Sequence, residues 1–367
     1  GIARAYDQMG KIYRFSNTEK ALELLFSSLR ISEDMGDLQE AASTCAAIGN
    51  VLYERGRTDE AATYFEKGLK ISEQIGDVIG IAQFCNNIGV KYALEWKWPH
   101  AIEYFHQTLS ISRKINDRMG MAFSYSNFGH AYSRMGVWEK AFECYFAGLK
   151  LSEELSDKRK TAFLYYKIGS AFLGMGSFQE AVQWIEKSLE IRERIGDTLG
   201  MAHCYEGMGK AYGELGEYGE ALQFLEKALE IHEREKGAWM VAGVKVSSAQ
   251  IHVNSKDFEK AVKLAEEAIG PLEEAKDIEL LTQAHQMAAE AYLGLRNSEK
   301  AMHHAEACLQ YACSMNSPKF EGRARRIVGA VLLNAGEYGR AEDELRLSMR
   351  LLKKHVYELA KTYIQFA

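Results

Sequence analysis

The chain has 367 residues, with 45 Lys/Arg against 51 Asp/Glu, a net charge of −6 and only three prolines. This acidic balance argues against a general nucleic-acid or membrane-surface binder, which needs a basic excess. A hydrophobic content of 47% is ample for a folded core and argues against disorder. Six cysteines without a C-x-x-C pair favour a reducing compartment, so we expect a cytoplasmic protein with no membrane segment.

An internal repeat organises the chain from one end to the other. Alanine stands at nine equally spaced positions, and a small residue and then Leu, Ile or Met follow seven and eight positions later. These three positions share one helical face, so each alanine marks a helix packed against another helix. The alanines are Ala21, Ala61, Ala101, Ala141, Ala181, Ala221, Ala261, Ala301 and Ala341.

A second small position lies twelve residues before each alanine from Ala61 onward, as at Gly49, Gly129 and Gly209. Glycine inside a helix costs about 1 kcal/mol relative to alanine, so a glycine kept in this register indicates close approach of two helices. Glycines such as Gly136 end the first helix of a pair, and aspartates such as Asp37 cap the helix that begins the next pair. Each unit is therefore predicted to be a helical hairpin.

This pattern resembles the tetratricopeptide repeat. The likeness rests on a small residue with an aromatic three positions on, as in Gly129 and Tyr132, and on the later alanine, aromatic and small residues. The period is longer than the family's usual one of about 34 residues, as it is in kinesin light chains, polarity adaptors and bacterial sensor arrays. The resemblance implies an all-α, right-handed superhelical solenoid of about nine antiparallel helix pairs, a single domain over 1–367. The expected repeats are 1–37, 38–77, 78–117, 118–157, 158–197, 198–237, 238–277, 278–317 and 318–355, and 356–367 is expected to begin a further helix.

Two places depart from the pattern. Trp96 stands where other repeats have a turn glycine, and it is not expected to adopt glycine's backbone conformation easily. Gly270 and Pro271 fall inside a second helix, so a bend or loosened joint is expected near 237–280. Because the first repeat starts partway through a helix and the last stretch opens a further unit, we expect a larger parent protein.

Catalytic and metal-binding motifs are missing. The sequence has no phosphate-binding loop, no H-E-x-x-H and no G-x-S-x-G, so we expect no enzyme activity and no cofactor. His304 and Cys308 have the spacing of a metal pair, but Cys308 fills the small packing position of its repeat. We therefore interpret this pair as core packing and expect no metal.

The binding surface is expected on the concave side, which first helices line in this family. Asparagine can bond both the donor and the acceptor of an extended peptide, lysine and arginine can hold a carboxylate, and aromatic rings can anchor apolar groups. The alternative is that these residues lie on the ordinary solvated faces of amphipathic helices. The groove residues are Gln83, Asn86, Asn87, Phe123, Asn127, His130, Arg134, Phe163, Tyr166, Lys167, His203 and Lys210.

A smaller basic patch is formed by Arg323 and Arg326 in the ninth repeat. Two interpretations are open: the patch attracts an acidic segment, or it is a solvated face. The region from Lys319 to Lys361 carries ten Lys/Arg against six Asp/Glu, so this end of the chain is locally basic.

The sequence favours a non-catalytic scaffold that captures a protein or peptide segment in its groove, as the sensor or regulatory region of a larger signalling protein. Two alternatives remain: an adaptor that self-associates through the array ends, and the regulatory part of an enzyme whose catalytic domain lies outside this chain.

Overall fold

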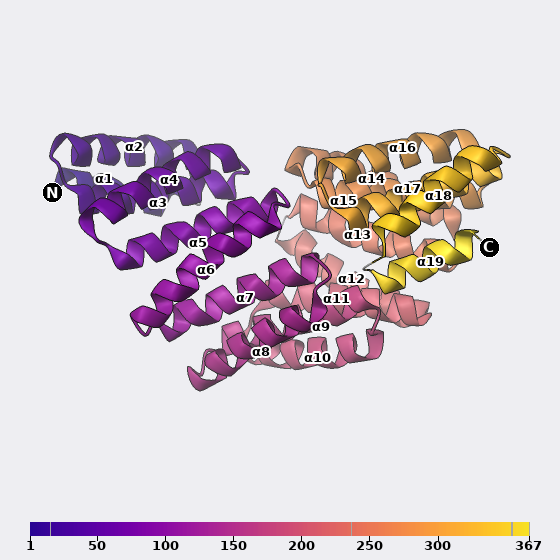
Figure 1. The fold of residues 1–367 in the computed structure, drawn as a ribbon, viewed down its shortest axis with the longest axis horizontal. Helices are drawn as coiled ribbons and strands as arrows, with labels where there is room; N and C mark the ends of the chain where they lie inside the picture. Colours follow the sequence, from indigo (N-terminus) through magenta and orange to yellow (C-terminus); the bar gives the residue numbers. More distant parts are fainter. Residues whose placement is uncertain (15, 236, 354, 367) are drawn as a thin grey trace. The chain divides into compact units, whose positions relative to one another are not determined.

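The computed structural model describes residues 1–14, 16–235, 237–353 and 355–366, and over these residues it is a series of antiparallel helix pairs without strands (Figure 1). The first helices are α1 (Ile2–Tyr13), α3 (Leu38–Glu54), α5 (Val78–Leu94), α7 (Arg118–Arg134), α9 (Lys158–Met175), α11 (Thr198–Leu215), α13 (Ala238–Asn254), α15 (Ile278–Gly294) and α17 (Pro318–Asn334). The second helices are α2 (Thr18–Asp34), α4 (Thr58–Ile75), α6 (Trp98–Lys114), α8 (Trp138–Glu154), α10 (Phe178–Ile195), α12 (Tyr218–Arg234), α14 (Phe258–Ala275), α16 (Ser298–Ser314) and α18 (Tyr338–Leu351). A further helix, α19 (Val356–Phe366), follows them as predicted, and Ala367 lies outside the described residues.

The chain divides into two compact units. Unit 1 comprises Gly1–Ala131 and Phe146–Leu151, and unit 2 comprises Tyr132–Tyr145 and Ser152–Ala367. In unit 1 the core gathers around side chains such as Ile48, Leu52 and Phe65. Unit 2 has several core clusters, among them one from Ala242 to Ala288 and one from Ala289 to Ala341. A single continuous solenoid stays a prediction.

The scaffold alanines and glycines lie where the repeat predicts them. All nine alanines are at most 1% exposed. A Cβ atom on Gly169 would lie 2.6 Å from Ile185 Cγ1 and 3.1 Å from the Ala181 carbonyl oxygen, and Gly209 has the same relation to Leu225 and Ala221. The glycines are therefore needed for the close approach of the two helices of a pair.

A turn follows each helix, so two turns occur in every repeat. A residue with positive φ stands at most of the described turns, and this residue is glycine at Gly36 or Gly136 but not everywhere. Trp96 adopts φ +59°, so the expectation that it would not replace glycine is wrong. The Lys97 N–H donates to the Tyr92 carbonyl across 2.9 Å, and the Trp96 ring meets Trp98 edge to face. These contacts offset the strain of about 1 kcal/mol that the left-handed region imposes on a non-glycine residue.

Aspartates cap many of the first helices. The carboxylate of Asp37 accepts a hydrogen bond from the backbone N–H of Glu40, and Asp157 and Asp197 do the same for the residues three positions later. These bonds satisfy N–H groups that have no partner within the helix. The capping role inferred from the sequence is confirmed.

The joint around Pro271 is packed as closely as its neighbours. Helix α14 runs without a break through Pro271, and Ala265, Ala268 and Leu272 are fully buried in one cluster with α13 and α15. The expected loosening is therefore not found at Pro271, and a bend or a loosened joint elsewhere between 237 and 280 stays a prediction. Within the described part of the chain, none of the helices has both the length and the apolar character that a bilayer crossing requires.

Candidate functional site

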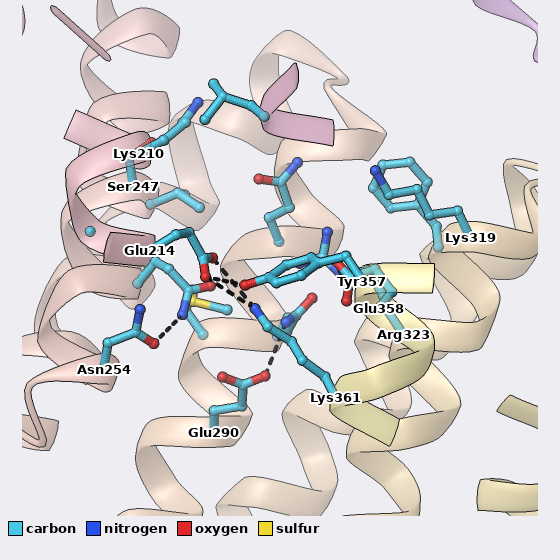
Figure 2. A pocket seen from close by; sticks show the side chains of 18 of the residues that line it. Lys210, Glu214, Ser247, Asn254, Glu290, Lys319, Arg323, Tyr357, Glu358 and Lys361 are labelled. Carbon is cyan, nitrogen blue, oxygen red and sulfur yellow. Dashed lines mark hydrogen bonds and ion pairs between the residues drawn. The ribbon is translucent and has the colours of Figure 1, made fainter. Parts of the chain in front are cut away.

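Unit 2 contains a cavity of about 660 Å³ that is lined mainly by first helices. Lining residues come from α7, α9, α11, α13, α15 and α17, with α19 along one side and Phe178 of α10 (Figure 2). This is the side of the repeat on which the sequence predicts ligand binding. Of the predicted residues, Arg134, Lys210, Arg323 and Arg326 line this cavity, whereas Phe163, Tyr166, Lys167 and His203 are not among its lining residues.

The charged side chains of the cavity are largely paired with one another. Arg326 is 6% exposed and donates to Glu358 of α19, with 3.0 Å between Nη1 and Oε2 and 3.2 Å between Nη1 and the Glu358 carbonyl oxygen. Arg323 Nε lies 3.6 Å from Glu358 Oε1. Burial opposes ionisation of Glu358, but Arg323 and Arg326 outweigh it and lower its pKa to about 2.

The basic patch predicted at Arg323 and Arg326 is thus not a solvated face. Its acidic partner is Glu358, which belongs to the same chain and follows Arg326 at a separation of 32 positions. The solvated-face interpretation is wrong because α19 packs against α17 and covers both guanidinium groups.

Two more contacts of α19 reach α11 and α10. The Tyr357 hydroxyl and Lys361 Nζ both donate to the Glu214 carboxylate, the lysine across 3.3 Å. Figure 2 shows these two side chains converging on Glu214. The Tyr357 ring also stacks edge to face on Phe178, with ring centroids 5.4 Å apart. Together with Glu358, these contacts hold α19 against α10, α11 and α17.

Arg134 at the end of α7 pairs with Glu279 at the start of α15. The two guanidinium nitrogens lie 3.1 and 2.7 Å from the two carboxylate oxygens, in a bidentate arrangement. The guanidinium also lies 5.5 Å from the centre of the Phe320 ring. Such planar pairing and ring stacking suit arginine better than lysine.

Two lysines near this pair have lowered pKa values. Burial, together with the positive charges of Arg323 and Arg134, lowers the pKa of Lys319 to about 8, against the opposing effect of Glu358 and Glu279. Burial and Arg134 lower the pKa of Lys167 to about 8, against Glu279. Lys167 Nζ also lies 5.3 Å from the centre of the Phe163 ring. Both ammonium groups are therefore under-compensated.

Amide side chains line the side of the cavity formed by α13 and α15. Gln250 Nε2 donates to Asn254 Oδ1 across 3.0 Å, and Gln286 Nε2 donates to Glu290 Oε1 across 3.0 Å. Gln283 lines the cavity beside them. Each amide retains donor and acceptor capacity beyond these bonds, which is what an extended peptide backbone needs.

The predicted aromatic residues of unit 2 form a neighbouring cluster. Phe163 lies close to two ammonium groups, since Lys160 Nζ is 5.0 Å from its ring centre and Lys167 Nζ is 5.3 Å from it. The Tyr166 ring lies 6.3 Å from the ring of His203, whose pKa is lowered by burial. Lys210 Nζ lies 3.7 Å from Glu206 Oε2.

In unit 1 the predicted asparagines form a row of amides across three helices. Asn127 Nδ2 donates to Asn86 Oδ1 across 2.7 Å, Asn86 contacts Asn87 across 3.4 Å, and Asn87 Nδ2 lies 3.5 Å from Asn50 Oδ1. We call these four residues the asparagine row. Gln83 and Asn50 line a second cavity of about 540 Å³ among α1, α3 and α5.

The remaining predicted residues of unit 1 lie on α7. Phe123 is 48% exposed, and the His130 ring meets the Trp98 ring edge to face with centroids 6.0 Å apart. The structure therefore brings the asparagines together in unit 1 and four of the predicted cations together in unit 2.

Several cavity residues were missed by the sequence analysis, although the repeat register marks them. Gln283 and Gln286 stand five repeat periods after Gln83 and Asn86, and Gln250 stands one period after Lys210. Extending the same positions through the last three repeats would have found them. Other charged or polar residues that were missed include Glu214, Asn254, Glu279, Glu290, Lys319, Tyr357, Glu358 and Lys361.

Histidine and cysteine side chains lie elsewhere. His304 is buried with its Nδ1 3.0 Å from Nδ1 of His285, and Cys308 is fully buried, as its interpretation as core packing predicts. Over the part of the chain that the structure describes, no group of three or more His, Cys, Asp or Glu side chains is arranged to hold a metal ion.

Comparison with known families supports the architecture. Residues 34–75 and 160–234 match the tetratricopeptide repeat. The chain is a tetratricopeptide-type repeat protein. These matches lie in both units, and the helix pairs between and beyond them repeat the same geometry.

Solved structures share the arrangement of this tetratricopeptide chain at low sequence identity. A Rap protein complexed with competence and sporulation factor is 14% identical, with 97% of this chain and 99% of that chain covered and a TM-score of 0.68. The Rap conjugation gene regulator of plasmid pLS20, in complex with the Phr* peptide, is 14% identical; the match covers 77% of this chain and 78% of that chain, with a TM-score of 0.62. Aspartyl phosphate phosphatase F from Bacillus subtilis is 13% identical; the match covers 96% of this chain and 94% of that chain, with a TM-score of 0.62. No curated protein sequence matches the chain.

Proposed function

We propose that the chain is a regulatory scaffold that binds a peptide or a protein segment in the cavity of unit 2. The observation that carries the proposal is a cavity of about 660 Å³ lined by six successive repeats, five of which contribute amide or charged side chains to it. A segment lying there could bond its backbone to Gln250, Asn254 and Gln283 and its charged groups to the cations of α7, α11 and α17.

Helix α19 supports this proposal because it is itself a segment bound in part of the cavity. It presents an aromatic ring, a carboxylate and an ammonium group, at Tyr357, Glu358 and Lys361, to partners on other helices. The cavity walls thus contain hydrogen-bonding, charged and aromatic groups that can bind a polypeptide segment.

The solved neighbours agree with peptide binding. One of the Rap structures is a complex with the Phr* peptide, and another is a complex with competence and sporulation factor. By likeness to them, we propose that ligand binding in the cavity controls a signalling partner, and that this chain is the sensor region. The asparagine row of unit 1 is the second candidate surface for the same kind of ligand.

A pair of matched double variants tests which surface binds. A displayed library of random twelve-residue peptides would be selected on the full chain, and the affinity of the selected peptides would then be measured by calorimetry. Replacing Asn254 and Gln283 by alanine should weaken binding by roughly tenfold or more, because each lost hydrogen bond contributes about 1 kcal/mol.

The control replaces Asn87 and Asn127 by alanine, which removes the same number of amides from unit 1. Weaker binding in this control alone would move the site to the asparagine row. Selection of no peptide at all would sink the proposed function. Self-association through the array ends stays a prediction, and light scattering of the same samples over a concentration series would check it.

A further inference from the structure

Helix α19 is attached to unit 2 on two sides. On the first side it packs on α17 and α18, in the place that the first helix of a further repeat would take. Thr362 is fully buried there, and its hydroxyl oxygen lies 3.3 Å from that of Ser348 on α18. Glu358 accepts a hydrogen bond from Arg326 of α17 across 3.0 Å. This side of α19 repeats the packing found between successive repeats.

The second attachment joins α19 to repeats that are not its neighbours in the chain. Tyr357 and Lys361 both donate to Glu214 at the end of α11, at separations of 143 and 147 positions. The Tyr357 ring also covers the turn after α9, where a Cβ atom on Gly176 would lie 2.9 Å from its Cδ2 atom. Units of a repeat array ordinarily contact only their neighbours. This attachment is therefore additional to the packing that the repeat requires.

The attachment at Glu214 is the weaker of the two. The side chains of Lys361 and Glu214 are 38% and 24% exposed, and an ion pair that is partly exposed contributes little because water competes for both charges. The side chains of Arg326 and Glu358 are only 7% and 11% exposed, so separating them would leave two charges buried without a partner. Helix α19 can thus release Glu214 while it stays attached to α17.

The side chains of the weaker attachment occupy the cavity that we assign to the peptide. Tyr357, Lys361 and Glu214 all line this cavity, and Figure 2 shows the first two directed from α19 toward the third. Glu214 stands one helical turn after Lys210, which lines the same wall. A peptide that fills the cavity along α11 must take the space of the Tyr357 ring and the Lys361 chain.

We infer that α19 is an internal competitor of the peptide: its contacts with Glu214 close the cavity, and peptide binding releases them. This inference rests on the proposed function and specifies how its site is regulated. A protein that is open for only part of the time binds its ligand with an affinity reduced by that fraction. The contacts at Glu214 therefore lower the affinity for the peptide, and the release of α19 is the change that a bound peptide causes in unit 2.

The test compares the full wild-type chain with the double variant Y357F/K361M, which removes both donors on α19 and keeps the side chains similar in size. The matched control is Y165F/K187M. The Tyr165 hydroxyl donates to Glu153 and Lys187 Nζ lies 6.0 Å from the Tyr165 ring centre, but neither residue lines the cavity. Calorimetry and stopped-flow mixing measure the affinity and the association rate of selected peptides, and hydrogen exchange of α19 is measured with and without peptide.

We expect Y357F/K361M to bind the selected peptides about fivefold more tightly than wild type, or more, and to associate with them faster. One lost hydrogen bond changes an equilibrium by about this factor. In wild type, added peptide should speed the hydrogen exchange of α19 and slow that of α11 and α13. Y165F/K187M should match wild type in all of these measurements.

Two other results would overturn the inference. Weaker binding by Y357F/K361M, with slower exchange of α19 when peptide is added, would make α19 a wall of the binding site. Equal binding by this variant and wild type, with unchanged exchange of α19, would make α19 a fixed cap. The proposed function stands in both cases. If neither wild type nor Y357F/K361M selects a peptide, the proposed function and the inference fall together.

Discussion

The two units build the same helix pairs but differ in the side chains of their inner faces. In unit 1 a row of neutral amides bond to one another from Asn50 to Asn127. In unit 2 the amides are joined by arginine, lysine and glutamate, some of which bond across helices far apart in sequence, such as Arg134 with Glu279. The scaffold positions are alike in both, since Ala61 and Ala221 are both buried.

Two sets of positions in the repeat therefore have different roles. Alanine and glycine positions determine how the helices pack, whereas the inward positions are free to vary because they contribute little to that packing. A surface of amides is suited to the backbone of a ligand, while a surface of unevenly paired charges selects the ligand's charge. Unit 2 is therefore the unit in which we expect specificity for a charged ligand.

The largest expected effect comes from removing the carboxylate that holds α19 in unit 2. Glu358→Ala leaves Arg326 buried without its partner, which typically costs about 3 kcal/mol. We expect hydrogen exchange of α19 to rise strongly while unit 1 stays protected. Glu342→Ala is the control, because Glu342 pairs with Arg346 on the exposed face of α18 and should cost less than about 0.5 kcal/mol. Unchanged protection of α19 in Glu358→Ala would contradict the role of this ion pair.

A somewhat smaller effect is expected from filling a scaffold glycine of unit 2. Gly169→Val forces a side chain against backbone atoms, since a Cβ would lie 3.1 Å from the Ala181 carbonyl oxygen and 3.3 Å from the Ile185 nitrogen. We expect a loss of about 2 kcal/mol in urea unfolding, because the helices must separate.

The same variant tests whether the units unfold independently. Hydrogen exchange should show lost protection in unit 2 alone; equal loss in both units would favour one cooperative solenoid. Gly219→Ala is the control, because nothing lies within 4 Å of its Cβ position on α12. It should stabilise the protein slightly, by less than about 1 kcal/mol.

The smallest effect is a dependence on alkaline pH that only unit 2 should show. The pKa values of Lys167 and Lys319 are about 8 in the folded chain and about 10.4 in an unfolded one. Between these values the unfolded chain binds more protons, so the free energy of unfolding rises with pH in this window. Full burial would make this gain roughly 3 kcal/mol for the two lysines, but water screens both partly exposed side chains, so we expect wild type to gain about 1 kcal/mol relative to K167Q/K319Q between about pH 7.5 and 9.5 in urea unfolding. Parallel pH curves for the two proteins would refute this.

Much of the fold could be predicted because the signals are local. Nine equally spaced alanines specify the helix pairs, and aspartates such as Asp157 cap them through contacts three residues away. The predictions at Trp96 and Pro271 failed because neighbouring residues offset an unfavourable local conformation. The left-handed conformation of Trp96 is stabilised by turn hydrogen bonds and by Trp98, and the joint at Pro271 stays closed because Leu272 is buried beside it.

The candidate site was harder to predict because its contacts span long distances in the chain. The register indicates which way a side chain points, and Arg134 and Lys210, two of the residues it places on the inner face, line the cavity. It does not indicate how far successive repeats rotate, and this rotation decides that Arg134 meets a carboxylate 145 residues away. For the same reason, the pairing of Arg326 with Glu358 could not be inferred from either residue's neighbourhood in the sequence.

The left-handed turn that recurs at residues such as Gly56, Gly76, Trp96 and Asn116 interrupts the chain at regular intervals, twice in each repeat. An extra residue inside a helix rotates every later side chain of that helix by about 100° and exposes its packed face. The next turn ends that helix and starts a new count, so the error stays within one segment. Whole segments can consequently be copied, deleted or exchanged with their inner faces intact, and a new ligand specificity can be assembled from existing parts.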